Sequence, residues 1–316
     1  MRTYLTVCII IALSMILCPL AATGGNVKDE ADTVTVIEQE KEADVISVML
    51  SDSGKSREIE MREYITGCVA AEMPPNYHTE ALRAQAVACF TYAKKVREDN
   101  TDKTADITDN PDVHQGYIDK NARKEKWGEK FEEYEEKIGE AVDSVLGEYM
   151  SHDGKTVLAV YHSNNAGRTR SAESLWGSEI PYLVSAESSG DRLSPDYMNT
   201  EVFSESDFSE CIKKCGVDTD GSAENWVGKI NTDEDGYVTS VNICGEEISG
   251  SDFRTALNLK SACFDIDYNG KFTVTCKGYG HGVGLSQYGA DYMARQGFSY
   301  KEILSHYYKG VSFENV

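Results

Sequence analysis

The spacing of hydrophobic residues predicts a helix that ends at a carboxylate. Met61, Ile65 and Cys68 recur at helical intervals. At about 100° per residue, Glu72 falls on the same face of that helix. Two prolines follow at 74–75, and a residue before proline avoids helical backbone angles, so the helix should end near Glu72. The pattern therefore places a carboxylate in an apolar stripe, within the last turn of a helix.

The predicted position affects the protonation of Glu72. The unpaired carbonyls of a last helical turn make the local potential negative, and burial also disfavours a charge. Both effects favour the neutral acid, and a carboxylic acid that stays neutral near pH 7 suits a general acid. The same features fit a structural glutamate that pairs with a buried arginine, lysine or backbone group. The pattern alone leaves both interpretations open.

A second helix is predicted from about Thr79, as its N-cap, to about Arg97. It is apolar almost all round, which indicates a central position in the core. The exception is Gln85, whose buried amide must find partners in the protein or in a ligand.

The rest of the chain alternates between helical and strand-like patterns. These are a hairpin at 44–60, helical patterns at 121–149 and 204–216, a strand at 156–163 and several short strands at 226–276. Two helices follow near the end, one reaching Gln296 and one starting at Ser299 with a capping box to Glu302. We therefore predict an α+β fold, in which a helical core carries the active site and β-rich segments, about 204–276, flank it.

The N-terminal residues predict export. Arg2 precedes a largely apolar run from Tyr4 to Ala22, which is typical of a signal peptide or a single membrane anchor. We expect residues 1–23 to be that leader, residues 24–44 to be an acidic flexible stalk, and the remainder to lie outside the cytoplasm.

Charge and cysteine usage narrow the classes of ligand. The chain has 31 basic and 53 acidic residues, a net charge of −22. This balance argues against sequence-independent binding of nucleic acid and against docking on anionic lipid, whereas a neutral glycan is compatible. No CxxC pair or HExxH motif occurs, so a zinc site has little support and we expect no cofactor.

Several stretches form one ordered set of motifs. They are Tyr64–Pro74 with Glu80–Tyr92, Tyr161–Tyr182, Gly278–Ala290 with Ile303–Gly310, and a weaker one at His114–Tyr117. In order and spacing they span about residues 60–310, and together they resemble the stage II sporulation protein D family, which also contains amidase-enhancer relatives. The resemblance implies a single catalytic domain, which we expect at about 45–316.

The resemblance implies a lytic transglycosylase that acts on peptidoglycan. Glu72 matches the family's acid/base, which protonates the glycosidic oxygen between N-acetylmuramic acid and N-acetylglucosamine. It then acts as a base on the C6 hydroxyl of the same sugar, which leaves a 1,6-anhydro end. The family also implies glycan stripped of stem peptides as the substrate, and a cell-wall amidase and a membrane partner during engulfment in sporulation or in cell-wall remodelling.

The resemblance also implies residues that bind the glycan. They are Gln85, Tyr92, His162, Ser163 and Asn164 along the cleft, with Ser286, Gln287 and Tyr288 closing it from the C-terminal side. One position departs from the family pattern, because Phe90 stands where arginine is usual; it adds apolar surface and removes a donor. Some members bind zinc through cysteines that residues 115–130 lack here, so we predict no metal.

Two other interpretations stay open. The chain could be a binding module that grips glycan and enhances a cell-wall amidase without cutting. It could also be a muramidase that uses water, which would leave reducing ends instead of anhydro ends.

Overall fold

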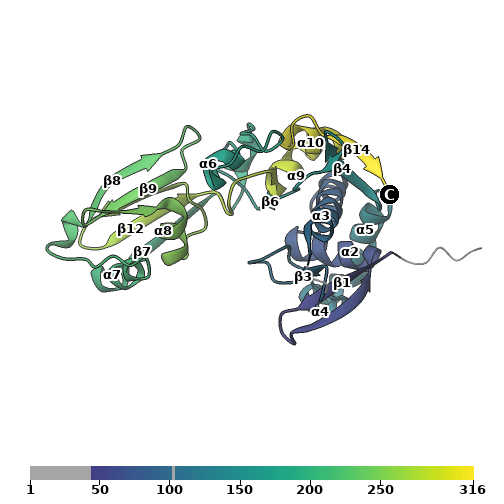
Figure 1. The fold of residues 1–316 in the computed structure, drawn as a ribbon, viewed down its shortest axis with the longest axis horizontal. Coiled ribbons are helices and arrows are strands. Elements are labelled where there is room, and N and C mark those ends of the chain that lie inside the picture. Colours follow the sequence, from purple (N-terminus) through teal and green to yellow (C-terminus); the bar gives the residue numbers. More distant parts are fainter. Residues whose placement is uncertain (1–43, 102–103) are drawn as a thin grey trace, which may run out of the picture. The chain divides into compact units, whose positions relative to one another are not determined.

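The computed structural model describes residues 44–101 and 104–316 (Figure 1). The predicted leader at 1–23 and the stalk at 24–44, except its last residue, lie outside these described residues. Within them, no helix combines the length and the apolar character needed to cross a membrane. Helices and several small sheets occur together, which confirms the α+β class.

The helical region is organised around two consecutive helices, α2 (Met61–Glu72) and α3 (Thr79–Asp99). The predicted central position of α3 is confirmed, since it packs against α2, α5 (Phe131–Asp143) and several further elements of the region. Its N-cap is His78 and not Thr79, because His78 Nδ1 accepts a hydrogen bond from the Glu80 N–H at 3.2 Å.

Short strands and further helices surround this pair. The predicted hairpin is confirmed as β1 (Val45–Leu50) with β2 (Lys55–Glu60), and β3 (Ile107–Thr108) adds to β1 in parallel. Another small sheet consists of β4 (Glu148–His152), β5 (Lys155–Thr156) and β14 (Ser312–Asn315).

The helical pattern at 121–149 is interrupted. It forms α4 (Lys120–Trp127), a 3₁₀ turn at Gly128–Lys130, and α5, which ends before β4 begins. Gly128 has a φ of 53°, a left-handed conformation that ends α4, and glycine adopts it without a steric penalty.

The β-rich region has its own core. One sheet contains β7 (Met198–Phe203), β11 (Phe264–Tyr268) and β12 (Phe272–Lys277); the other contains β8 (Val227–Thr232), β9 (Val238–Ile243) and β10 (Glu246–Ser249). The predicted helix at 204–216 is confirmed as α7 (Glu205–Lys213), and α8 (Gly250–Ala256) is an addition to the prediction (Figure 1). In this core Phe208 stacks on Phe272 and meets Phe253 edge-on.

Two short strands join the middle of the chain to its end. These are β6 (Tyr161–His162) and β13 (Leu285–Ser286), which pair in parallel. Of the predicted strand at 156–163, only the two ends form strands, as parts of β5 and β6. The backbone between them forms other hydrogen bonds: the Leu158 N–H donates to the Tyr182 hydroxyl at 2.8 Å.

Two predicted helices close the chain. They are α9 (Gln287–Arg295) and α10 (Tyr300–Tyr307), and the capping box between Ser299 and Glu302 is confirmed. The segment between β6 and β7 carries α6 (Ala172–Trp176) and a 3₁₀ turn, η2 (Ser189–Leu193), which packs on α9.

Candidate active site

Glu72 is the last residue of α2, as the sequence predicts. The next residue, Met73, is already extended (φ −123°, ψ 138°), and its N–H closes the last turn onto the Val69 carbonyl at 2.9 Å. The Glu72 side chain is half-buried. The proline-terminated helix therefore delivers its carboxyl group to the border between the core and solvent.

The surroundings of Glu72 oppose each other in their effect on its pKa. Burial is the largest influence and raises the pKa of Glu72 above its ordinary value. The Gly116 N–H donates to Oε1 at 2.8 Å, and hydrogen bonding from Gln287 and Tyr161 also favours the carboxylate. The net pKa stays raised, so the group is a weak acid that still has partners ready to stabilise its charged form.

A glycine lies opposite Glu72. A Cβ atom added to Gly116 would lie only 3.0 Å from Glu72 Oε1, which is tighter than an ordinary contact. The absence of a side chain lets the Gly116 backbone approach the carboxyl group. This gives the motif His114–Tyr117 a definite part in the site.

Glu72 lines two cavities. We call the first the polar cavity; it has a volume of about 580 Å³ and is lined with Tyr77, Ser163, Gln287, Tyr288, Asp291 and Arg295. We call the second the aromatic cavity; it has a volume of about 460 Å³ and is lined with Tyr92, His114, Gln115, Tyr161, Trp176 and His281. Volumes of this size suit small-molecule or sugar ligands.

The structure divides the sequence-predicted glycan-binding residues into two groups. Those that line a cavity together with Glu72 are Tyr92, Ser163, Gln287 and Tyr288. Those that are buried and line neither cavity are Gln85, His162, Asn164 and Ser286. The second group shapes the walls from behind.

His162 joins the loop after β6 to the glycine-rich segment. Its Nδ1 lies 3.1 Å from the Val283 carbonyl, and its Nε2 lies 3.3 Å from the Asn165 amide nitrogen. Burial lowers the pKa of His162 to about 3, so the ring is neutral, donating to the carbonyl and accepting from the amide. Gly280 is needed here, since a Cβ there would meet His162 Cβ at 2.7 Å.

Ser286 is the N-cap of α9. Its Oγ accepts from the Gly289 N–H at 3.1 Å and donates to Asp191 Oδ1 at 2.8 Å. Asp191 is fully buried, and its other oxygen accepts from Ser188 Oγ at 2.9 Å and from the Asn165 N–H at 3.2 Å. Asp191 therefore ties its own segment and the loop after β6 to the start of α9, where Gln287 meets Glu72.

Asp191 is a residue that the sequence did not single out. Burial raises its pKa to about 7, although its hydrogen bonds favour the charged form. Nothing near it in the sequence marks it among 53 acidic residues. Only the fold brings it beneath the helix that carries Gln287.

A buried polar network lies beside Glu72. The Tyr161 hydroxyl donates to Gln115 Oε1 at 3.1 Å, and Gln115 Nε2 donates to the Tyr64 hydroxyl at 3.1 Å. Gln85 Nε2 donates to Cys89 Sγ at 3.3 Å, while Gln85 Oε1 is buried without a partner among the described residues. Sequence reasoning assigned no role to Gln115 or Tyr161, although each lies inside a motif.

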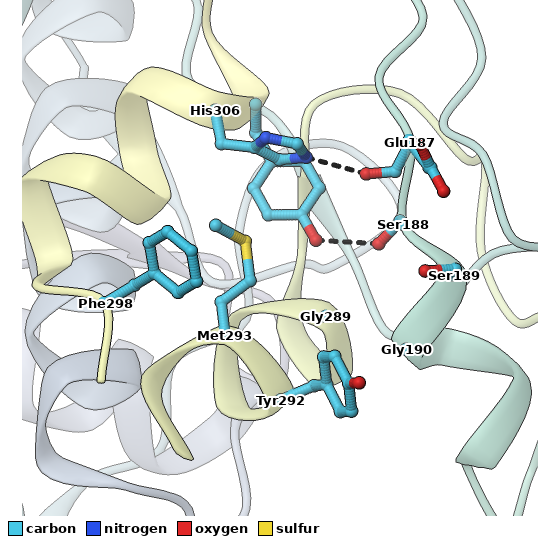
Figure 2. Close-up of a pocket in the computed structure, with 10 residues that line it drawn as sticks. Glu187, Ser188, Ser189, Gly190, Gly289, Tyr292, Met293, Phe298 and His306 are labelled. Atoms are coloured by element: carbon cyan, nitrogen blue, oxygen red, sulfur yellow. Dashed lines mark hydrogen bonds between the residues drawn. The ribbon is translucent and has the colours of Figure 1, made fainter. Parts of the chain in front are cut away.

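A third cavity lies away from Glu72, between α9, α10 and the segment before η2 (Figure 2). It has a volume of about 240 Å³, with Met293 and Phe298 on one side and Glu187–Gly190 on the other. The Tyr307 hydroxyl in its wall bonds to Ser188 Oγ at 2.7 Å, so this cavity shares the Asp191 network. Sequence reasoning did not anticipate it.

The described part of the chain shows neither a group of metal ligands nor a disulfide bond. Residues 44–101 and 104–316 contain no group of three or more His, Cys, Asp or Glu placed to hold a metal ion. The seven cysteines within these ranges are unpaired thiols.

Comparison with known proteins gives consistent matches. A family model described as stage II sporulation protein matches residues 51–152. The stage II sporulation protein D of Bacillus amyloliquefaciens is 39% identical over 258 residues, covering 80% of this chain and 74% of that protein. The protein of the same name from Bacillus subtilis (strain 168) is 36% identical over 299 residues, covering 91% and 86%. The amidase enhancer of Bacillus subtilis (strain 168) is 25% identical over 303 residues, covering 78% and 40%.

Proposed function

This chain belongs to the stage II sporulation protein D family, and from that premise we propose that it cleaves peptidoglycan glycan strands as a lytic transglycosylase. One observation carries the proposal: a half-buried carboxyl group with a raised pKa lines two cavities at once. A glycan strand needs room on both sides of the bond that is cut. Glu72 lies where such a strand would present its glycosidic oxygen.

In the first step, protonated Glu72 donates its proton to the glycosidic oxygen between N-acetylmuramic acid and N-acetylglucosamine. The bond from C1 to that oxygen breaks, and N-acetylglucosamine leaves with a hydroxyl group. Glu72 becomes a carboxylate as positive charge develops at C1. The Gly116 N–H, Gln287 and Tyr161 then stabilise the new negative charge, which is the kind of preorganised support that lowers a barrier.

In the second step, the C6 hydroxyl of the N-acetylmuramic acid attacks C1. Its proton passes to Glu72, which restores the acid, and a 1,6-anhydro ring forms. The attacking hydroxyl belongs to the substrate, so no carboxylate nucleophile is needed. Asp291 in the polar cavity fits this account, because its oxygens already accept from the His78 N–H at 2.6 Å and from Arg295 Nε at 2.7 Å.

The setting of this activity is part of the same proposal. The apolar run from Tyr4 to Ala22 supports export, so the protein would act outside the cytoplasm. The leader would be either cleaved or kept as a membrane anchor. The family supports a role in sporulation on glycan stripped of stem peptides. A relative named amidase enhancer supports a partnership with a cell-wall amidase.

The test uses the purified exported portion of the chain on denuded glycan strands, with mass spectrometry of the products. We expect 1,6-anhydro ends from the wild type. Glu72→Gln should lower turnover by about a hundredfold or more, since general acid–base groups contribute about 10²–10⁴. Glu136→Gln on the exposed face of α5 is the matched control and should keep full activity.

Two outcomes would contradict the proposal. Full activity of Glu72→Gln would remove Glu72 from the chemistry, and reducing ends would indicate hydrolysis by water. The relative named amidase enhancer favours one second candidate, a binding module that activates an amidase. That candidate predicts no new glycan ends from the purified chain and a faster amidase in its presence.

A further inference from the structure

The aromatic cavity contains an exposed tryptophan that the chemistry at Glu72 does not use. Trp176 lines this cavity and is 44% exposed, although large aromatic side chains are usually buried. It is the last residue of α6, and Gly177 ends that helix in a left-handed conformation with a φ of 71°. A core role does not explain a half-exposed indole at this position.

The backbone that carries Trp176 is held firmly. Arg170 is buried, and its Nε donates to Ser174 Oγ at 2.9 Å and to Asp233 Oδ2 at 3.0 Å. An Nη2 of the same guanidinium donates to the Ser174 carbonyl at 2.8 Å. A buried charged pair thus fixes α6, so the indole is presented from a rigid support while its own ring stays accessible.

Rings come from three further parts of the chain. The His281 ring lies 6.4 Å from the Trp176 ring, tilted by 41°. The Tyr92 ring lies 6.4 Å from the His114 ring, in an edge-on arrangement. All four residues line the cavity, so rings from α3, α6 and two loops surround one space.

The aromatic cavity carries little charge. Burial lowers the pKa of His281 to about 4 and also lowers the pKa of His114, so both rings are neutral near pH 7. No Lys or Arg is among the residues that line it, and Asp112 is the one acidic residue there besides Glu72. Neutral aromatic walls suit a neutral ligand with flat apolar faces, and the faces of pyranose rings have that character.

We propose that Trp176 is a stacking platform for a sugar ring of the glycan strand, beyond the bond that is cut, and that it governs how tightly longer strands bind. This inference rests on the proposed function of the same cleft and names a specificity residue within it. The platform holds the strand and takes no part in proton transfer. Removing it should therefore affect binding and KM, with kcat nearly unchanged.

The binding experiment uses the Glu72→Gln variant as the parent, so that no sugar is cut. Calorimetry measures the Kd for two probes, chitohexaose and denuded glycan strands. Trp176→Ala in this parent should weaken binding by about tenfold, the scale of one lost aromatic stack, and Trp176→Phe should restore most of it. Tyr279→Ala is the matched control, because Tyr279 is 41% exposed but lines neither cavity, and it should bind like the parent.

Kinetics give the second readout. In the otherwise wild-type chain, Trp176→Ala should raise KM for long strands about tenfold and change kcat by less than about twofold. The effect should shrink for the shortest strand that is still cut. Thermal unfolding of each variant shows whether the fold is kept, and Trp176→Phe preserves ring volume if the alanine variant is unstable.

The outcomes separate this inference from the proposed function. Equal affinity of the parent and its Trp176→Ala variant for both probes overturns the platform, as does a parent that binds neither probe at millimolar concentration. Weaker binding by Trp176→Ala, together with a wild type that makes no anhydro ends, supports the platform and overturns the catalytic proposal.

Discussion

The two cavities that meet at Glu72 differ in chemistry. The polar cavity is lined by α9, which contributes Gln287, Asp291 and Arg295, and two of these form an ion pair at 2.7 Å. The aromatic cavity is lined by rings, including Tyr92 and Trp176. One acid thus has hydrogen-bonding and charged groups on one side and uncharged flat surfaces on the other. From this difference we infer that the polar cavity stabilises the charge that forms on Glu72, and that the aromatic cavity binds the glycan strand.

The same division separates the responses to pH. Both histidines of the aromatic cavity have lowered pKa values, and that of His281 is about 4, so the His281 ring does not gain charge between pH 5 and 8. The polar cavity rests on Asp191 through Ser286 and α9, and the pKa of Asp191 is about 7. We therefore expect pH to act on the polar side and on Glu72 itself.

After Glu72 itself, the largest effect should come from Gln287, the polar-side partner of Glu72. Gln287→Ala removes hydrogen bonding that favours the charged carboxylate, and bonds to charged groups contribute about 1.5–3 kcal/mol. We expect kcat on denuded glycan to fall by about tenfold or more, because the carboxylate formed in the first step loses support. Gln296→Ala, at the exposed far end of the same helix, is the control and should keep kcat.

The pH profile of Gln287→Ala gives a second readout of the same change. Activity requires protonated Glu72, so it falls as pH rises through the pKa of Glu72. The bond from Gln287 lowers that pKa, so its loss should move the alkaline limb of kcat to higher pH. A limb that stays in place, or moves to lower pH, would show that Gln287 does not act on Glu72.

Asp191 should have the next largest effect, on stability. Its pKa rises from 3.8 to about 7 on folding, so its protonated form favours the fold. That stabilisation is complete below about pH 4 and is lost as pH rises through about 7. Asp191→Asn removes the titration and points an amide N–H₂ at one of the hydroxyl or N–H donors, which should cost about 1–3 kcal/mol.

Urea unfolding at pH 5 and pH 8 checks this prediction. The loss caused by Asp191→Asn should be larger at pH 5, where the wild-type acid is mainly protonated, than at pH 8. Glu72 titrates in both proteins, so its contribution cancels in the difference. Equal losses at the two pH values would mean that Asp191 does not change its protonation on folding.

The sequence predicted the part of the site that depends on local structure. Pro74 and Pro75 end α2, and the spacing of Met61 and Ile65 fixes its buried face, so the position of Glu72 followed from neighbours in the chain. The alternate glycines from 278 to 284 lie inside one of the motifs, and their φ values of 75–117° are ones that glycine adopts without strain. Ser163 and Gln287 were identified through motifs, and both line a cavity with Glu72.

The rest depends on contacts between distant segments, which have no local pattern. Asp191 meets Ser286 across 95 positions, and Tyr161 meets Gln115 across 46. The strand expected at 156–163 has the right alternation, but Tyr182 takes one of its backbone donors. Buried polar residues such as Gln85 and His162 were expected to touch substrate, yet the fold uses their hydrogen bonds internally.

Phe90 should give the smallest effect on activity, and it tests whether the two cavities account for the whole site. The family usually has arginine here, but Phe90 is only 4% exposed, packs in the helical core and lines neither cavity. Phe90→Leu keeps an apolar side chain of similar size, so it should lower the free energy of unfolding by less than about 1.5 kcal/mol. Because Phe90 lines neither the polar nor the aromatic cavity, kcat and KM should stay within about twofold of wild type.

Val87→Ala in the same helix, also buried in that core, is the control for a purely structural loss. A changed kcat in Phe90→Leu with unchanged stability would make position 90 part of the catalytic surroundings, and the division into a polar and an aromatic side would then need a third component beneath α3.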